Sequence, residues 1–493
     1  MRGSNKASSL TIEFSIQRCS PRGALLLCFA VFSLGGCTVG PKYVRPTADV
    51  PSNYKENADW KPAQPGDELV KGKWWEIYQD SQLDTLEEKV DVSNQSLKAA
   101  QAQFLQARAA LRISRSGLFP TITANPLISR DRVSANRPLA IPGGTTNYAD
   151  YQFPAIDASY EADVWGRVRR TVEASRSEAQ ASAADLASVG LSLHAELAMD
   201  YFQLRGLDAQ KQLLDSTVAS YQKALDLTQS RYGGGLASAV DVAQAQTQLE
   251  TARAQSIDVE VQRAAFEHAI ALLIGQPASK FSLSALPLSV PPPPIPPGLP
   301  SDLLERRPDI SAAERRVQAA NAQIGVARAA YFPLITLTGL GGFESIAAGT
   351  LFQGPSGLWA VGGAAAETLF DAGRRRGVSD QAKAAYDQSV DNYRQTVLTA
   401  FQEVEDNLAA LRILQSEAQT EDVAVAAAQH SVDLSLTRYK GGVTNYLEVT
   451  TAQSAALTDE VTAVTILTRR MTASVLLIKA IGGGWNVTQI PAV

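Results

Sequence analysis

The stretch RYGGGLASAVDVAQAQ at residues 231–246 recurs 207 residues later as RYKGGVTNYLEVTTAQ at residues 438–453. Each copy opens with an Arg-Tyr-x-Gly-Gly turn signal and continues with apolar residues at helical spacing. Residues 166–169 match residues 373–376 at the same offset. Self-similarity at a fixed spacing is the mark of a duplicated unit, so the chain is expected to contain two copies of one structure.

The offset changes upstream of the first strands. Arg115, Phe119 and Pro120 match residues 328, 332 and 333, an offset of 213. The difference of six residues must fall between Thr123 and Gly166. A surface loop tolerates such an insertion best, so we expect a loop there.

Each repeat is typical of a helix, a β-hairpin, a very long helix, a turn and a second long helix. The first helices are expected at 83–118 and 302–331, each followed by a proline. Alternating Thr-rich and β-branched runs predict strands on either side of loops at 129–149 and 341–357. The long helices are expected at 167–231 and 374–438, and some 65 residues at 1.5 Å each give about 100 Å.

The helices after the turns carry a coiled-coil pattern. Ten positions from Val242 to Leu273 follow strict 3-4 spacing, and eight of them are apolar. The ten equivalent positions from Val449 to Ala480 also include eight apolar residues. This pattern favours two long helical hairpins, although a soluble helical bundle would give the same periodicity.

The N-terminus has the features of a bacterial lipoprotein signal. Arg18 and Arg22 precede an apolar run at 24–34, which ends in Leu-Gly-Gly before Cys37. We expect cleavage before Cys37, with diacylglycerol and an N-acyl chain on that residue. Thr38 in the next position favours the outer membrane. The alternatives to a lipoprotein signal are an ordinary secretory signal with a chance Cys and a short buried helix.

The predicted organisation follows from these boundaries. Residues 1–36 form the signal, 37–82 a lipidated segment that packs around the helices, and 83–277 and 302–482 the repeats. Residues 278–301 form a Pro-rich strap between the repeats that is not expected to enter the core. Residues 483–493 form a tail. No later run offers 18 uninterrupted apolar residues, so we expect no transmembrane helix and any membrane crossing to be a β-barrel.

Composition argues against an enzyme. The chain has three Cys, all before residue 38, and its three His are far apart, so no metal site is expected. No Gly-x4-Gly-Lys-Ser/Thr loop occurs. The net charge of −5 without a basic cluster argues against nucleic-acid binding. We expect no catalytic residue and no cofactor other than the lipid.

Several motifs together resemble the TolC family of outer-membrane efflux proteins, in the lipoprotein branch that includes OprM and NodT. They are the segments at 37–41, 165–167, 304–310 and 370–374 and the two Arg-Tyr-x-Gly-Gly turns, in this order around a duplication. The resemblance covers essentially the whole mature chain.

The resemblance implies a mainly α fold with a small transmembrane β-barrel. Each chain of a homotrimer would give four strands to a twelve-stranded barrel and its hairpins to a periplasmic helical tunnel. Four strands alone leave open edges, which also favours oligomerisation. The implied function is a passive conduit that exports drugs and toxic compounds. It would work with a periplasmic adaptor and an inner-membrane pump of the resistance-nodulation-division class. A lipid-anchored periplasmic scaffold without a pore is the alternative.

Two sets of site residues follow. In this family the turns meet the adaptor, and the expected contact residues are Arg231, Tyr232, Gly234, Gly235, Arg438, Tyr439, Gly441 and Gly442. The four glycines are also expected to supply positive φ and end the long helices. Asp226 and Asp433 are candidates for a ring of carboxylates at the closed aperture, and Leu436 for an apolar constriction. Solvated helix faces would account for the same acidic residues.

Two further features have alternative readings. Arg374, Arg375 and Arg376 could lie at the inner face of the outer membrane or start a helix. Trp165 could belong to an interfacial aromatic belt or pack where a strand meets a helix.

Overall fold

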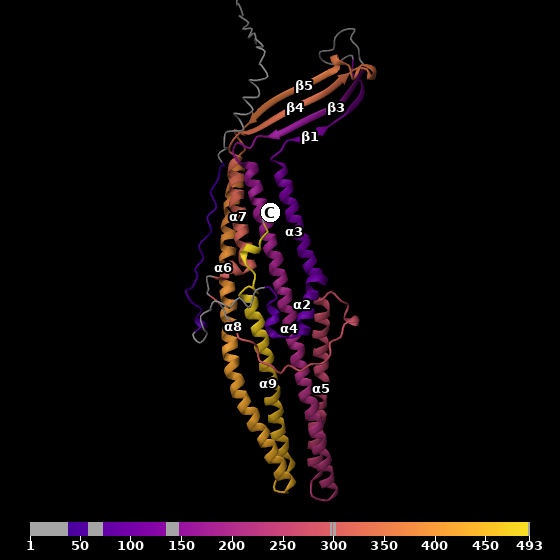
Figure 1. Ribbon diagram of the computed structural model, residues 1–493, viewed down its shortest axis with the longest axis vertical. Helices are drawn as coiled ribbons and strands as arrows, with labels where there is room; N and C mark the ends of the chain where they lie inside the picture. The colour runs from indigo at the N-terminus through magenta and orange to yellow at the C-terminus, as the bar shows by residue number, and fades with distance from the viewer. Residues whose placement is uncertain (1–37, 58–71, 135–146, 296–297, 299–301, 492–493) are drawn as a thin grey trace, which may run out of the picture. The chain divides into compact units, whose positions relative to one another are not determined.

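The computed structural model describes residues 38–57, 72–134, 147–295, 298 and 302–491. Cys37, the signal and Trp60 therefore lie outside the described residues. The chain divides into two compact units (Figure 1). One contains residues 120–169 and 328–369 and holds the strands. The other contains the rest of the described chain from Gly40 and is helical.

The strand unit is one antiparallel sheet. Its strands are β1 (Thr121–Ala124), β2 (Leu127–Arg132), β3 (Asn147–Glu161), β4 (Leu334–Ser345) and β5 (Gly357–Ala366). Both β1 and β2 pair with β3, on either side of a register shift between Phe153 and Ile156. They thus share one strand position, and the sheet has the four positions expected, in the order β1/β2, β3, β4, β5. Within the described residues, both outer strands have only one neighbour.

The helical unit contains the elements of both repeats. The helices are α2 (Ser81–Ser93), α3 (Gln95–Ser116), α4 (Arg167–Gly233), α5 (Ala239–Leu273), α6 (Leu303–Arg306), α7 (Pro308–Ala329), α8 (Arg374–Lys440) and α9 (Tyr446–Ala480). Both α4 and α8 have 67 residues, which corresponds to about 100 Å. The two long helical hairpins are therefore confirmed, and each turn lies at the same end of this unit (Figure 1).

The prediction of one continuous first helix in each repeat is wrong. The first is interrupted at Asn94, whose side-chain oxygen accepts a hydrogen bond from the Leu97 amide at 2.9 Å and caps α3. Its amide nitrogen donates to the Leu273 carbonyl at 2.7 Å. The copy is interrupted at Arg307, between α6 and α7. In the first repeat the break fastens α3 to the end of α5.

Two glycines show the duplication in three dimensions. Gly275 follows α5 with φ +68°, and Gly482 follows α9 with φ +99°. A Cβ atom on Gly275 would lie 2.4 Å from the Ser93 carbonyl oxygen, and one on Gly482 would lie 2.1 Å from that of Arg306. The two glycines are 207 residues apart and their partners are 213 residues apart. These are the two offsets of the duplication, so the same contact occurs once in each repeat.

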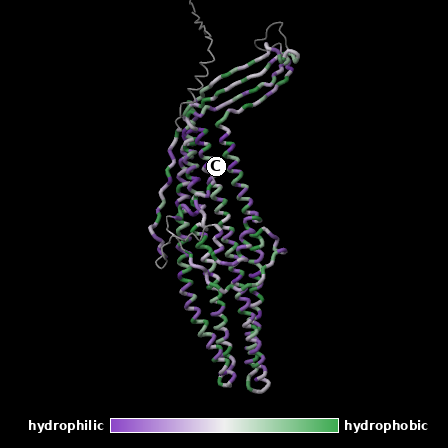
Figure 2. The backbone as a smooth tube through the Cα atoms, viewed as in Figure 1, coloured by the Kyte–Doolittle hydropathy of each residue, from purple (hydrophilic) through white to green (hydrophobic). Residues whose placement is uncertain are grey.

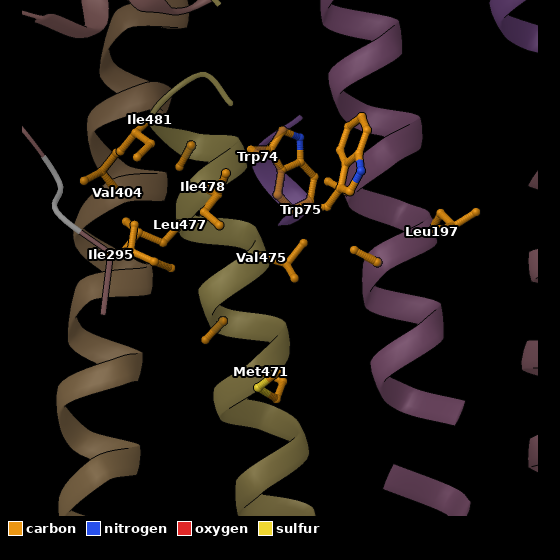
Figure 3. Packing of buried hydrophobic residues seen from close by; sticks show 14 of the residues in the cluster. Trp74, Trp75, Leu197, Ile295, Val404, Met471, Val475, Leu477, Ile478 and Ile481 are labelled. Atoms are coloured by element: carbon orange, nitrogen blue, oxygen red, sulfur yellow. The ribbon is translucent and has the colours of Figure 1, made fainter. Parts of the chain in front are cut away.

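The main core lies where the helices of both repeats meet. Trp74 and Trp75, from the short helix η3 (Trp74–Tyr78), pack with side chains of α4, α8 and α9 (Figure 3). Ile295 joins them with 1% of its surface exposed, and Leu283 is 6% exposed. The prediction that residues 278–301 stay out of the core is therefore wrong. Leu283 and Ile295 of the strap belong to the buried cluster that the helices of both repeats form.

The long helices alternate polar and apolar positions along their length (Figure 2). Seven of the ten predicted seam positions of α5 are buried. Helix α9 is long and apolar enough to cross a bilayer by composition, but 44% of its most apolar window is buried. We assign it as a core helix, because α8 covers it and its buried seam runs from Val449 to Ala480.

Candidate functional site: the tips of the helical hairpins

The first tip joins α4 to α5. Gly235 has φ +73°, and the Leu236 amide donates to the Arg231 carbonyl at 2.8 Å, which ends the helix. Ser238 caps α5, and its backbone amide donates to the Asp241 carboxylate at 2.9 Å. Asp241 thus acts as an N-terminal helix charge within a capping box.

The second tip joins α8 to α9 with the same hydrogen bonds. The Val443 amide donates to the Arg438 carbonyl at 3.0 Å, and Gly442 has φ +75°. Gly441 has φ −75°, and Gly234 is not left-handed either. The prediction of positive φ is therefore wrong for these two, because each turn needs only one left-handed residue.

The two Arg-Tyr pairs occupy different environments although they match in sequence. Arg231 reaches the second tip, where Nη1 donates to the Lys440 carbonyl at 2.9 Å. Its guanidinium carbon lies 4.9 Å from the centre of the Tyr439 ring. Tyr439 is only 2% exposed, so its prediction as an exposed contact is wrong. Tyr232 is 52% exposed, as expected of a contact residue.

Arg438 remains near its own hairpin. Its Nε lies 3.2 Å from a Glu448 carboxylate oxygen, and 54% of its side chain is exposed. An exposed ion pair of this kind contributes little stability. Arg438 is therefore available for a further contact.

A small apolar core holds the two hairpins together behind the tips. The Tyr439 and Tyr446 rings meet edge to face with centroids 5.2 Å apart. Tyr221 donates to the Gln453 carbonyl at 3.0 Å, which links α4 to α9. Val449 and Leu249 are buried in the same cluster. This core fixes the position of one tip relative to the other.

The three aperture candidates differ in exposure. Asp226 is exposed and accepts a hydrogen bond from Gln222 at 2.9 Å, and Asp433 is exposed on α8. Leu436 is partly buried against the tip core, so it is not available as a free constriction. The structure instead exposes Val240 by 64% and Leu447 by 54%. These two occupy equivalent positions at offset 207, a signal that was present in the sequence.

The secondary candidates take structural roles. Arg375 lies 2.7 Å from the Asp371 carboxylate at the start of α8, so this arginine starts a helix. Trp165 donates through Nε1 to the Pro333 carbonyl at 2.9 Å and stacks on Phe332. These contacts favour a helix start for the arginines and packing at the strand–helix junction for Trp165.

A buried acid lies in the middle of the helical unit. Glu87 of α2 is fully buried, with a carboxylate oxygen 2.7 Å from His194 Nδ1 of α4. Burial is the main cause that raises the pKa of Glu87 from 4.5 to about 7, although the hydrogen bond and charge of His194 oppose it. Burial lowers the pKa of His194, but the hydrogen bond and charge of Glu87 outweigh this and leave it raised. Trp75 stacks on the His194 ring.

This pair predicts that the protein is more stable in mild acid. Both folded-state pKa values are raised, so the folded chain holds extra protons and loses that stabilisation as the pH rises from about 4.5 to about 7. Glu87→Gln should flatten the stability curve by about 1–3 kcal/mol over this range. Thermal unfolding across the range measures it, with His268→Gln as an exposed control. A Glu87→Gln curve as steep as that of the wild type would contradict the assignment.

Among the described residues, no group of three His, Cys, Asp or Glu is placed to hold a metal ion. The candidate site is the surface of the two tips, where arginine, tyrosine and glycine residues are exposed and a buried core holds the tips in place.

Comparisons with known proteins agree with this arrangement. The model of the outer membrane efflux protein family matches residues 87–276 and 299–483. A curated relative in Pseudomonas putida, the probable efflux pump outer membrane protein TtgC, is 33% identical over 94% of this chain and 96% of its own. The outer-membrane channel OprN superposes with a TM-score of 0.83 at 29% identity, over 91% of this chain and all of that one. The CmeC outer membrane channel of Campylobacter jejuni gives 0.84 at 26%, covering 92% and 96%.

Proposed function

This chain belongs to the outer membrane efflux protein family, and we propose on that premise how it assembles and works. It is an outer-membrane channel component of a tripartite efflux system, and its helices extend into the periplasm. It resembles channel proteins, and we propose that it performs no chemistry on its cargo of drugs and toxic small molecules and needs no cofactor.

The open edges of the sheet support a trimer. Among the described residues, no further strand pairs with the β1/β2 edge or the β5 edge, and an open strand edge cannot face lipid without a partner. Ile128, Trp359 and Val361 are each more than 75% exposed on the strands, as expected of a surface that meets lipid. Three chains with four strand positions each would close a barrel of about twelve strands. The open edge is the observation that carries this proposal.

The tips support docking of an adaptor. Leu236 and Val443 lie in the two turns and are 71% and 70% exposed, and exposed apolar side chains are expected at a protein interface. The periplasmic adaptor would join this channel to an inner-membrane pump of the resistance-nodulation-division class. That pump would supply the energy and select the exported compounds. Cys37 would carry a diacylglycerol and an N-acyl chain, which the intact mass of the mature protein can verify.

Reconstitution of the full mature protein tests the proposal. We expect a trimer in detergent, measured by light scattering, and discrete single-channel currents in a planar bilayer. A monomer that gives no current would reject the channel and support the scaffold without a pore.

The aperture gives a separate prediction. Asp226→Ala combined with Asp433→Ala should raise single-channel conductance and reduce cation preference, because a ring of carboxylates holds cations at the entrance and slows their passage. The matched variant is Val240→Ala with Leu447→Ala, which removes the exposed apolar pair. Unchanged currents in the first variant and larger currents in the second would assign the closure to the apolar residues.

A further inference from the structure

The two hairpins meet through an Arg-Tyr motif that each of them contains. Arg231 lies over Tyr439, and the repeat gives the equivalent pair Arg438 and Tyr232. Tyr439 is 2% exposed, but Tyr232 is 52% exposed. The same motif is therefore covered in one repeat and uncovered in the other.

We propose that a second copy of this chain covers the first tip, and that Arg438 of one subunit lies over Tyr232 of the next. The inference rests on the proposed trimer. In the proposed trimer, six similar hairpins surround one axis. The second hairpin of each chain therefore meets the first hairpin of the next subunit in the same way as the first hairpin of a chain meets its own second hairpin. This equivalence turns the contact of Arg231 with the Lys440 carbonyl into one of Arg438 with the partner's Gly233 carbonyl. The contacts within and between chains thus alternate around one ring.

A second contact, further from the tips, supports the same arrangement independently. Within the chain, Gly206 of α4 lies so close to Thr468 of α9 that a Cβ atom on it would be 2.2 Å from Thr468 Oγ1, so this contact needs the glycine. At the equivalent positions the repeat has Ile413 of α8 and Val261 of α5, whose larger side chains require these two helices to lie farther apart than α4 and α9 do. Ile413 is 54% exposed and Val261 is 68% exposed. Exposed apolar side chains are expected at an interface that forms on assembly.

The exposure of these two side chains follows from their position. Within the described residues, no other element covers Ile413 on α8 or Val261 on α5. In the assembly, the apolar pair would exclude water between α8 of one subunit and α5 of the next. The Arg438–Glu448 ion pair is exposed, so little stability is lost when Arg438 turns to the partner's tyrosine.

Cysteine cross-linking tests the lateral contact, since the chain has no cysteine after Cys37. We expect Val261→Cys with Ile413→Cys to give covalent dimers and trimers on oxidation, which a thiol reductant reverses. The matched control is Ser114→Cys with Ser175→Cys, whose hydroxyl oxygens lie 2.7 Å apart; this pair should close a bond within one chain and give no larger species. Single-cysteine variants should give none. Trimers without cross-links at 261 and 413 would overturn this inference alone, whereas failure to form trimers would overturn the assembly as well.

A double-mutant cycle tests the tip contact. Arg438→Ala and Tyr232→Ala should each lower the temperature at which the trimer dissociates, and the double variant should lower it no further than the stronger single variant. Additive shifts would show that the two residues do not meet. Arg438→Lys should restore only part of the shift, because a guanidinium stacks on an aromatic ring better than an ammonium does.

Discussion

Asp208→Ala is expected to destabilise the helical unit by about 3–5 kcal/mol, the usual cost of breaking a buried ion pair. One Asp208 oxygen accepts from Arg263 Nε at 2.7 Å. The other accepts from Arg205 Nη1 at 3.2 Å and from the Leu286 amide at 2.9 Å. The Asp208 and Arg205 side chains are 1% and 3% exposed. The substitution would leave a buried guanidinium without its carboxylate and release the strap.

The measurement is thermal or denaturant unfolding followed by far-ultraviolet circular dichroism. Glu250→Ala on α5 is the matched control, because its ion pair with Arg253 is about half exposed and should cost less than about 1 kcal/mol. Limited proteolysis should also cut the strap sooner in the Asp208 variant. Equal losses of stability in both variants would show that burial does not set the strength of these pairs.

The long elements could be predicted from the sequence because their signals are local and repeated. The expected helix at 167–231 appears as Arg167–Gly233, and that at 374–438 as Arg374–Lys440. Uninterrupted helical periodicity and a glycine turn at each end are sufficient to place such elements. The Thr-rich alternating runs indicated the strands, but the expected loops were too long: β2 extends to Arg132, β3 begins at Asn147 and β4 extends to Ser345.

What the sequence did not predict depends on contacts between distant residues. Asn94 interrupts the first helix because its amide reaches the Leu273 carbonyl. Ile295 enters the core because a gap between helices of both repeats accepts it. The sequence around Asn94 does not indicate its contact with Leu273, and the sequence around Ile295 does not indicate its place in the core. The Pro-rich composition around Ile295 instead suggested an exposed strap.

The tip residues show a different limit. Matching motifs at 231 and 438 predict matching environments, and the structure gives them different ones. Tyr439 is buried because Arg231 and Tyr446 cover it, while Tyr232 has no equivalent cover within the chain. Sequence similarity between repeats predicts local geometry, but burial depends on which neighbour the chain itself supplies.

Gly482→Ala is expected to cost more than about 3 kcal/mol and to reduce the yield of folded protein. A left-handed φ of +99° already disfavours alanine by about 1 kcal/mol. The new Cβ atom would also lie 2.1 Å from the Arg306 carbonyl oxygen, so two backbone segments must separate. The neighbouring Arg307 resists this movement, because it donates to the Ala480 carbonyl at 3.0 Å and to Glu403 at 2.6 Å.

Gly233→Ala is the control that separates this contact from the general effect of adding a methyl group. Gly233 is the last residue of α4, and no atom lies within 4 Å of a Cβ placed there. Alanine at this position should be neutral or stabilise by up to about 1 kcal/mol, because it favours the helix. Gly275→Ala should behave like Gly482→Ala, since its Cβ would lie 2.4 Å from the Ser93 carbonyl oxygen. Unfolding temperatures of the three variants decide the point. If the Gly482 and Gly275 variants unfold at the same temperature as the wild type, the close contact that occurs in both repeats does not hold the ends of α5 and α9 in place.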